Sequence, residues 1–252
     1  YNYLVVTSLP SKKAYRELRN AYLQEIDVNY DLLFDLLSLA YNQRTIYEIQ
    51  ELLNNGSVED ISHAVEMIDH FVYDDIKPVL FPVVENIPIR EKVKRLQYYF
   101  PIESMDEEEI LSSTLTRDYN LLAIYPRICA LQLTLTRPDF KVNQELISNL
   151  FHPNRLLREV AALVIHKKDP DLFESILERL DPDIQFELRE TLNIVENESS
   201  YLTIEKFNLL RNTDKLAGMP ESILIEFAEA FQEFKFSEGS VLNLNTNTRE
   251  FS

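Results

Sequence analysis

The chain has 252 residues, of which 45% are hydrophobic and 27% are charged. This composition excludes a chain that is disordered along its whole length, and the length is enough for one large domain or two smaller ones. It has 3 glycines where average usage would give roughly 18, and neither a Rossmann nor a P-loop fingerprint is present. The net charge of −17 repels phosphate backbones, so we expect no nucleic-acid partner.

The single cysteine and the lack of long apolar stretches indicate the cellular compartment in which we expect the protein. Cys129 is the only cysteine and has apolar neighbours, which predicts a small buried side chain and a reducing environment. No apolar stretch approaches the roughly 20 residues that span a bilayer, and no signal segment opens the chain. We therefore expect a cytoplasmic protein or the soluble part of an inner-membrane protein. Because the first residue is Tyr1, we expect either a processed chain or a segment of a longer protein.

Apolar residues recur at helical spacing from the start of the chain. They predict three helices before residue 56, around residues 15–22, 32–40 and 46–53. With so little glycine, we expect about a dozen helices, mostly of roughly 9 to 16 residues, joined by short loops. The predicted fold class is all-α.

Helix start signals recur along the rest of the chain. A serine followed three residues later by an acid has capping-box spacing at Ser57–Asp60 and at Ser104–Glu107. Proline follows aspartate at Asp169–Pro170 and Asp181–Pro182, which predicts proline at the first helical position.

The chain also contains an internal repeat. Sliding it by 97 positions aligns apolar residues with apolar residues and caps with caps. The aligned pairs are Ile49 with Leu146, Leu53 with Leu150, Ser57 with Asn154, Ala64 with Ala161, Ile68 with Ile165, Val79 with Ile176, Leu80 with Leu177 and Val83 with Leu180. Together with Ala130, the alanines mark a unit of about 31 to 33 residues, and one unit near Leu96 lacks its alanine.

That unit has the length of one helix pair. A small residue at the repeated position lets consecutive pairs approach closely, so we expect Ala64, Ala130 and Ala161 to be buried against adjacent pairs. The pattern predicts an α-solenoid of antiparallel helix pairs. Residues 146–180, with Pro153 at a turn, Arg158 early in the second helix and Ala161–Ala162 after it, resemble a HEAT-type repeat.

Residues 33–84 resemble a narrower group. The positions that carry this likeness are Leu33, Leu36, Leu37, Leu39, Tyr41, Ile46, Ile49, Leu53, Ala64, Glu66, Ile68, Asp69, Pro78 and Pro82. They resemble the HEAT-like region of a bacterial membrane-protein family, in which nucleotide-translocase-like or major-facilitator-like domains carry a soluble helical extension on their C-terminal side. The likeness covers residues 30–180, although Ile61 stands where that repeat would have an arginine.

A polar, serine-rich segment at residues 197–202 divides the chain into a HEAT-like domain, 1–196, and a second part, 203–252. The second part resembles the opening of a cyclic-nucleotide-binding domain, a domain that often follows the repeats in the same family. The residues concerned are Leu209, Leu210, Leu216–Pro220, Leu224, Phe227, Ala228, Phe231, Phe234, Gly239 and Val241. The phosphate-binding cassette of that family would lie beyond Ser252, so we expect this chain to bind no cyclic nucleotide.

For this second part we expect a truncated domain. Residues 221–234 are predicted to form an amphipathic helix that buries Leu224, Phe227, Ala228 and Phe231. An extended segment should follow at 236–244, and residues 243–252 should be mobile unless something covers them.

Two groups of polar residues invite a metal-site interpretation. His63 and His70, with Glu66 between them, share a helix face but lie about 10 Å apart along the axis, whereas zinc pairs are usually one turn apart. The acidic run of Glu103, Asp106, Glu107, Glu108 and Glu109 follows Ser104, which favours a solvated helix start. We therefore predict no metal or cofactor ligands, and no catalytic residues because no nucleophile and base have a recognisable arrangement.

Basic residues cluster at Lys12, Lys13, Arg16 and Arg19, and again at Arg90, Lys92, Lys94 and Arg95. Either cluster could contact anionic headgroups if a membrane domain adjoins the chain. The alternative is a solvated helix face paired with nearby acids, which we favour for the second cluster and weigh equally for the first.

The leading functional interpretation is a non-catalytic scaffold or regulatory extension of a transporter-like membrane protein, which relays small rotations between helix pairs to a membrane domain. The runner-up is a free-standing adaptor that binds a protein partner in a concave groove. A third is an enzyme whose site is assembled from dispersed residues. In the first two, the partner is a protein, and any membrane association comes through an adjoining domain.

Overall fold

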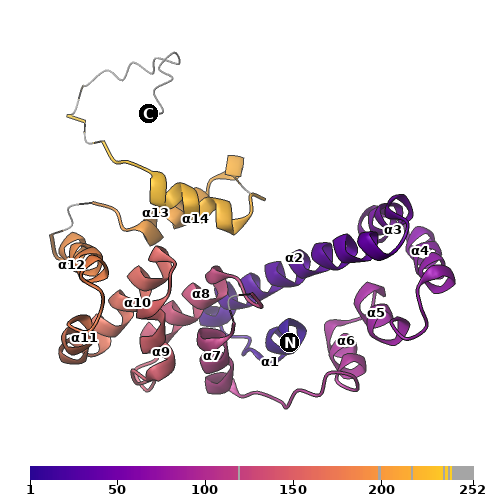
Figure 1. Ribbon diagram of the computed structural model, residues 1–252, viewed down its shortest axis with the longest axis horizontal. Coiled ribbons are helices and arrows are strands. Elements are labelled where there is room, and N and C mark those ends of the chain that lie inside the picture. The colour runs from indigo at the N-terminus through magenta and orange to yellow at the C-terminus, as the bar shows by residue number, and fades with distance from the viewer. Residues whose placement is uncertain (119, 198–199, 217, 235, 238, 240–252) are drawn as a thin grey trace. The chain divides into compact units, whose positions relative to one another are not determined.

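The structure is a computed structural model, and it describes residues 1–252 except 119, 198–199, 217, 235, 238 and 240–252 (Figure 1). The described residues form α-helices and short 3₁₀ turns with no strand among them, so the predicted all-α fold is confirmed. The chain divides into two compact units, Tyr1–Leu188 and Arg189–Ser252. Each unit is described by itself below.

The first unit contains the helices up to the start of α12. They are α1 (Asn2–Ser8), α2 (Arg16–Ala40), α3 (Gln43–Asn55), α4 (Val58–Phe71), α5 (Lys77–Val84), α6 (Ile89–Leu96), α7 (Glu107–Thr116), α8 (Ile124–Leu135), α9 (Gln144–Ser148), α10 (Arg155–Lys168), α11 (Pro170–Leu177) and α12 (Pro182–Asn197), which continues into the second unit. Short 3₁₀ turns lie at Lys13–Tyr15 and Asn149–Phe151.

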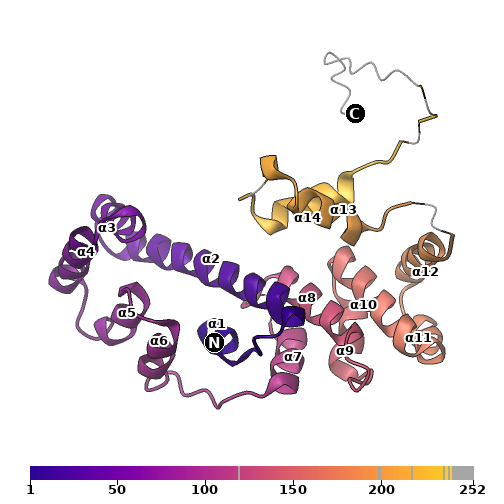
Figure 2. The ribbon, with the colours of Figure 1, turned by 180° about the vertical axis from the view of Figure 1, so that it is seen from behind.

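One continuous helix, α2, replaces the first two predicted helices. The predicted interruption between residues 22 and 32 is wrong, because that stretch contains neither glycine nor proline and every residue in it can remain helical. A short helix that was not predicted, α1, packs against α2 and α6, and lies beside α2 in both views (Figure 1, Figure 2).

The start signals are confirmed at three of four places. Ser57 and Asp60 form a reciprocal capping box at the start of α4, and Pro170 and Pro182 are the first residues of α11 and α12. The predicted cap at Ser104 is wrong, since α7 begins two residues later with Asp106 as its cap. An aspartate caps as well as a serine, and Asp106 has the acid Glu109 at the same spacing.

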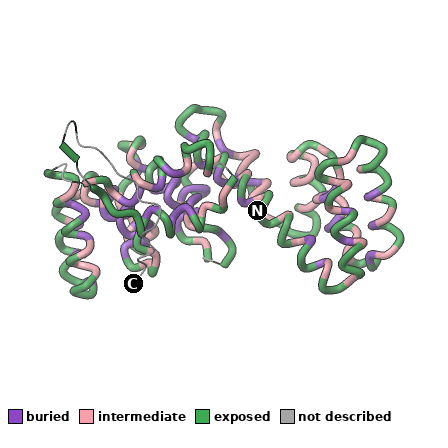
Figure 3. Tube along the Cα trace, turned by 90° about the horizontal axis from the view of Figure 1, so that it is seen from above, coloured by how far each residue is buried: buried purple, intermediate pink, exposed green. Residues whose placement is uncertain are grey.

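The core of the first unit runs along its helices as a series of buried faces. Most helices alternate buried and exposed positions along their length, as amphipathic helices do (Figure 3). One cluster, centred on Phe34, Ile49 and Ile68, joins α2, α3, α4 and α5. Another part of the core joins α8 to α10, and α10 also packs against α11.

The three alanines of the repeat pattern are each 0% exposed, which confirms their predicted burial. Ala64 lies on α4, Ala130 on α8 and Ala161 on α10. Cys129, next to Ala130, is buried as predicted.

The second unit contains the end of α12, α13 (Thr203–Arg211), a 3₁₀ turn (Asp214–Leu216) and α14 (Glu221–Ala230). Leu224 and Ala228 are buried, as predicted, but Phe227 is 39% exposed and Phe231, just past the helix end, is 50% exposed, so those two predictions are wrong. Ile225 is buried in place of Phe227, because the face that packs on α13 is centred between positions 224 and 228.

The extended segment predicted at 236–244 is only partly described. Phe236 and Ser237 have no regular secondary structure, and Gly239 has a positive φ of 85°, which glycine adopts without steric cost. The rest of that segment, and the predicted mobile residues 243–252, lie outside the described residues.

Candidate functional site

A cavity of about 600 Å³ lies in the first unit, where α1, α2, α5 and α6 face the segments that precede and follow α7. Its lining residues are Tyr1, Asn2, Tyr3, Leu4, Ile26, Asn29, Tyr30, Leu32, Leu33, Ile76, Val79, Leu80, Val83, Val93, Leu96, Gln97, Phe100, Ile102, Arg117, Asn120 and Leu121. Leu32, Phe100 and Leu121 are each more than half exposed, so part of the apolar wall meets solvent. A cavity of this size is typical of small-molecule sites.

Helical spacing explains how α2 contributes to this wall. Ile26, Asn29, Tyr30 and Leu33 recur every three or four residues and therefore share one face. Opposite them, α5 has the sequence KPVLFPVV, whose single charge is at its first residue. An apolar helix and an apolar face of a longer helix thus meet across the cavity.

Arg117 has the one charged side chain among the lining residues, and it directly follows α7. Its guanidinium carbon lies 3.5 Å from the centre of the Tyr1 ring, a cation–π contact, and Arg127 donates a hydrogen bond to its backbone carbonyl. Its Nε is buried, and none of the described residues accepts a hydrogen bond from it.

The tyrosines near this wall are partly removed from water. Burial, with smaller contributions from Tyr3 and Asp31, raises the pKa of Tyr30 to about 12. Burial followed by the charge of Asp27 raises the pKa of Tyr3. Both phenols therefore remain neutral hydrogen-bonding groups at physiological pH.

The second basic cluster lies on α6, and two of its four residues, Lys92 and Arg95, have partners. Lys92 donates to the backbone carbonyls of Val83 and Glu85 at 2.5 and 2.9 Å, and burial lowers its pKa. Arg95 pairs with Glu85 and Glu91 at 2.8 and 3.1 Å. These contacts favour a structural role for Lys92 and Arg95.

The first basic cluster lies on the 3₁₀ turn and the first turn of α2. Arg19 donates to the backbone carbonyls of Leu9 and Pro10, and Arg16 pairs with Glu17. Lys12 and Lys13 are exposed. Headgroup contact by this cluster stays a prediction.

A second apolar feature, which we call the α2 stripe, consists of Val28, Leu32, Leu36 and Leu39. These side chains are 62%, 51%, 55% and 84% exposed. Their spacing of four, four and three residues places them along one face of α2, adjacent to the cavity-facing side at Leu32. A contiguous exposed apolar surface of this kind marks interaction sites in soluble proteins.

An acidic row borders the α2 stripe. Asp27, Asp31 and Asp35 follow one another at four-residue spacing and are exposed. Gln50 and Tyr47 of α3 donate hydrogen bonds to Asp31 and Asp35, and the described part of the chain offers none of the three aspartates a cationic partner. Burial, followed by the charge of Asp31, raises the pKa of Asp27. The stripe is therefore flanked by unneutralised negative charge.

Local composition reinforces this charge. Residues 24–70, which span most of α2, all of α3 and most of α4, contain ten acidic residues and one arginine, and all of the acids except Glu25 are exposed. Such a surface attracts cationic partners over about 10 Å at ordinary ionic strength.

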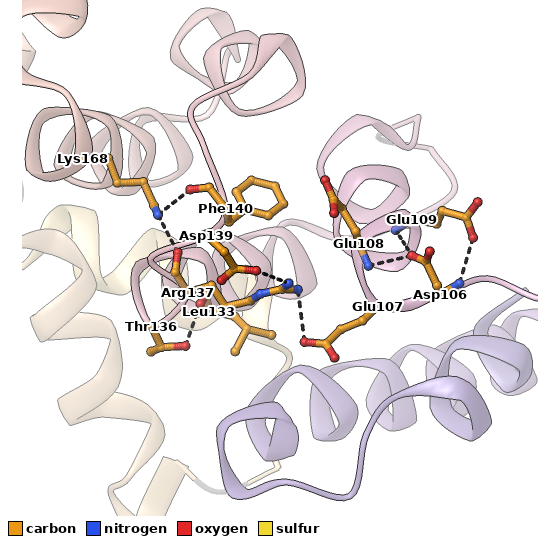
Figure 4. A network of polar contacts seen from close by, with 10 residues as sticks. All are labelled: Asp106, Glu107, Glu108, Glu109, Leu133, Thr136, Arg137, Asp139, Phe140 and Lys168. Carbon is orange, nitrogen blue, oxygen red and sulfur yellow. Dashed lines mark hydrogen bonds and ion pairs between the residues drawn. The ribbon is translucent and has the colours of Figure 1, made fainter.

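Four residues of the acidic run, Asp106 to Glu109, lie at the start of α7, as the sequence predicted, and Glu103 lies three residues before the cap. Asp106 accepts hydrogen bonds from the backbone amides of Glu108 and Glu109, and Glu109 accepts one from the backbone amide of Asp106 (Figure 4). Glu107 pairs with Arg137 at 3.1 Å, which ties α7 to the end of α8. These contacts assign the run to helix capping and packing.

The histidine pair lies on α4. His70 is exposed, and its Nδ1 lies 2.7 Å from the backbone carbonyl of Glu66. Among the described residues, no three His, Cys, Asp or Glu side chains are grouped so that they could hold a metal ion.

We expect zinc and calcium to leave the melting temperature of the protein unchanged. An ion that bound the folded state would raise the melting temperature by mass action. Metal analysis of the purified chain and melting curves with and without each ion check this expectation. A metal ion present in stoichiometric amount, together with a melting temperature that rises when that ion is added, would contradict this expectation.

Arg158 forms a buried network between α10 and α12. Its Nε and Nη2 donate to the two carboxylate oxygens of Glu187 at 3.1 and 2.6 Å, and its Nη1 donates to the carbonyls of His152 and Pro153, both at 2.8 Å. The two side chains are 10% and 19% exposed. Arg158 thus holds the turn before its own helix, α10, against α12.

His152 in that turn predicts a dependence of stability on pH. Burial, followed by the charges of Arg127 and Arg158, lowers its pKa below the ordinary value of about 6.5. As the pH falls through 6.5, the unfolded chain therefore gains a proton before the folded one does, and the stability that His152 contributes at neutral pH is lost. We expect a His152→Asn variant to lose less stability than the wild type between pH 7.5 and 5.5 in urea unfolding. The same substitution at exposed His63 is the control, and an equal loss in all three proteins would contradict the prediction.

Sequence reasoning missed both the cavity and the α2 stripe. The signal for the stripe was present, because α2 has apolar residues on two faces rather than one. The cavity had no such signal, since its walls come from segments up to 120 residues apart.

No protein-family model matches the chain, and comparisons with curated proteins and with solved structures give no significant match. Within the described residues, no helix is both long enough and apolar enough to cross a membrane.

Proposed function

We propose that the protein is a non-catalytic helical-repeat scaffold that docks a partner protein along the α2 stripe. The observation that carries the proposal is the stripe itself, four exposed apolar side chains on one face of a 25-residue helix. Helical-repeat proteins bury their faces against neighbouring pairs and use extended surfaces for binding. The buried alanines on α4, α8 and α10 support the repeat architecture on which this proposal depends.

The chemistry of the surface specifies the occupant. An apolar row matches an amphipathic helix, whose own apolar residues recur at the same spacing. The acidic row beside it, at Asp27, Asp31 and Asp35, matches lysine or arginine next to that apolar face. We therefore propose a basic amphipathic helix as the partner segment.

Two settings suit this function. The sequence resemblance supports a regulatory extension of a transporter-like membrane protein, in which the partner helix belongs to the membrane domain of the same chain. The alternative is a free-standing adaptor whose partner is another protein. Sequencing the gene on both sides of residues 1–252 distinguishes them, because the first setting requires apolar segments of about 20 residues in the same reading frame.

Fluorescence anisotropy with two synthetic helices tests the proposal. One is a labelled 18-residue peptide of leucine and lysine, and the other replaces each lysine with glutamate. We expect the full chain to bind the lysine peptide and not its glutamate counterpart, with affinity that falls as salt is added.

Two pairs of variants locate the binding. Leu36→Ser/Leu39→Ser should weaken binding at least tenfold, whereas Val58→Ser, which removes an exposed apolar residue from α4, should not change it. Asp31→Lys/Asp35→Lys should weaken binding more than Glu226→Lys/Glu229→Lys, which makes the same charge change on α14. Equal effects within either pair would refute docking on the stripe. If the stripe instead mediates self-association, sedimentation will show a dimer that Leu36→Ser/Leu39→Ser dissociates.

A further inference from the structure

We infer that the cavity of the first unit binds a single-chain amphiphile with one carboxylate, of the fatty-acid class, and that Arg117 receives the carboxylate. This site is separate from the docking function of the α2 stripe. The two share Leu32 at their common edge, so the test below does not alter Leu32.

The walls specify the tail of the ligand. Thirteen of the lining residues have aliphatic side chains or are phenylalanine, and three more are tyrosines. These residues come from α1, α2, α5 and α6 and from the segments that adjoin them and α7, and they surround about 600 Å³, which is more than a single side chain can fill. A flexible hydrocarbon chain is the kind of group that such a surface removes from water.

Arg117 specifies the head of the ligand. Arg117 lines the cavity, and none of the carboxylates in the described residues pairs with its guanidinium. Its Nε, which is itself out of reach of solvent, has no acceptor there either, although a buried donor normally has one. Two of the other polar groups of the wall are less available, because the side-chain amides of Asn29 and Gln97 already donate to the backbone carbonyls of Glu25 and Ile102. A carboxylate would give Arg117 a charge-assisted partner.

The number of charges on the ligand follows from the number of charged side chains in the wall. Arg117 is the one charged side chain there, so a single negative charge is matched and a polyanion is not. The net charge of −17 further disfavours phosphorylated ligands. A monocarboxylate with an apolar chain satisfies both requirements.

Displacement of a dansyl-labelled undecanoate from the full chain tests this inference. We expect palmitate to displace the probe, and methyl palmitate, which has the same tail without the charge, to do so at least tenfold more weakly. Arg117→Gln should weaken palmitate binding at least tenfold and leave methyl palmitate unchanged. Arg16→Gln is the matched control, because Arg16 is exposed and is not among the lining residues.

A second variant fills the cavity without removing the arginine. Val83 is only partly buried, so Val83→Trp can place its ring in the cavity and should abolish binding of both palmitate and its ester. Melting curves check that each variant is folded. We expect Arg117→Gln to fold, because Arg127 donates its hydrogen bond to the backbone carbonyl of residue 117, which the substitution keeps. Equal binding of palmitate and its ester, binding unaffected by Val83→Trp, or no displacement of the probe by palmitate would each overturn the inference.

Discussion

Replacing Arg158 with alanine is expected to lower the free energy of unfolding by about 3 to 5 kcal/mol, because the change breaks a buried ion pair and leaves groups that were paired without their arginine. The guanidinium makes two hydrogen bonds to Glu187 and two to the backbone carbonyls of His152 and Pro153. Urea unfolding of the two proteins measures the difference.

Three further variants make this result interpretable. Arg16→Ala removes an exposed arginine whose ion pair with Glu17 should contribute about 1 kcal/mol or less. Arg158→Lys keeps the charge but cannot form the bidentate pair, so it should recover only part of the loss. Arg158→Met/Glu187→Leu replaces both charges and should be more stable than Arg158→Ala. A loss with Arg158→Ala no larger than that with Arg16→Ala would contradict the role assigned to this network.

Replacing Ala161 with leucine is expected to lower the free energy of unfolding by about 1 to 3 kcal/mol, because the added carbons have no space between packed helices. Ala161 is 0% exposed on α10, which packs against both α8 and α11. Ala40→Leu is the control, because Ala40 is exposed at the end of α2. Thermal melting checks both variants, and an unchanged midpoint for Ala161→Leu would show that the repeat register is wrong.

Signals that act within one turn of a helix were readable from the sequence. The capping box of Ser57 depends on residues three positions apart, and proline at the start of α11 depends on its own missing amide hydrogen. The burial of Ala64, Ala130 and Ala161 was also predictable, because each is a small residue within an apolar pattern of helical spacing. Such features need no knowledge of the rest of the fold.

Features that depend on tertiary packing were not readable in the same way. Two residues near position 105 could cap α7, because Ser104 and Asp106 each have an acidic residue three positions later. Asp106 is the cap in the structure. Phe227 is on the exposed side of α14 because α13 covers the neighbouring face at Ile225. The cavity requires α1, α5 and α6 to meet one face of α2, which no local pattern specifies.

Methyl NMR of the full chain, titrated with the leucine–lysine helix, tests whether the partner helix docks on the α2 stripe. We expect the methyl signals of Val28, Leu32, Leu36 and Leu39 to shift together and to saturate at one peptide per chain. The methyls of Val58 and Leu209, which are 75% and 59% exposed elsewhere on the chain, should keep their positions. Shifts spread evenly over all exposed methyls, or a stripe that stays unchanged while the peptide binds, would contradict docking on α2.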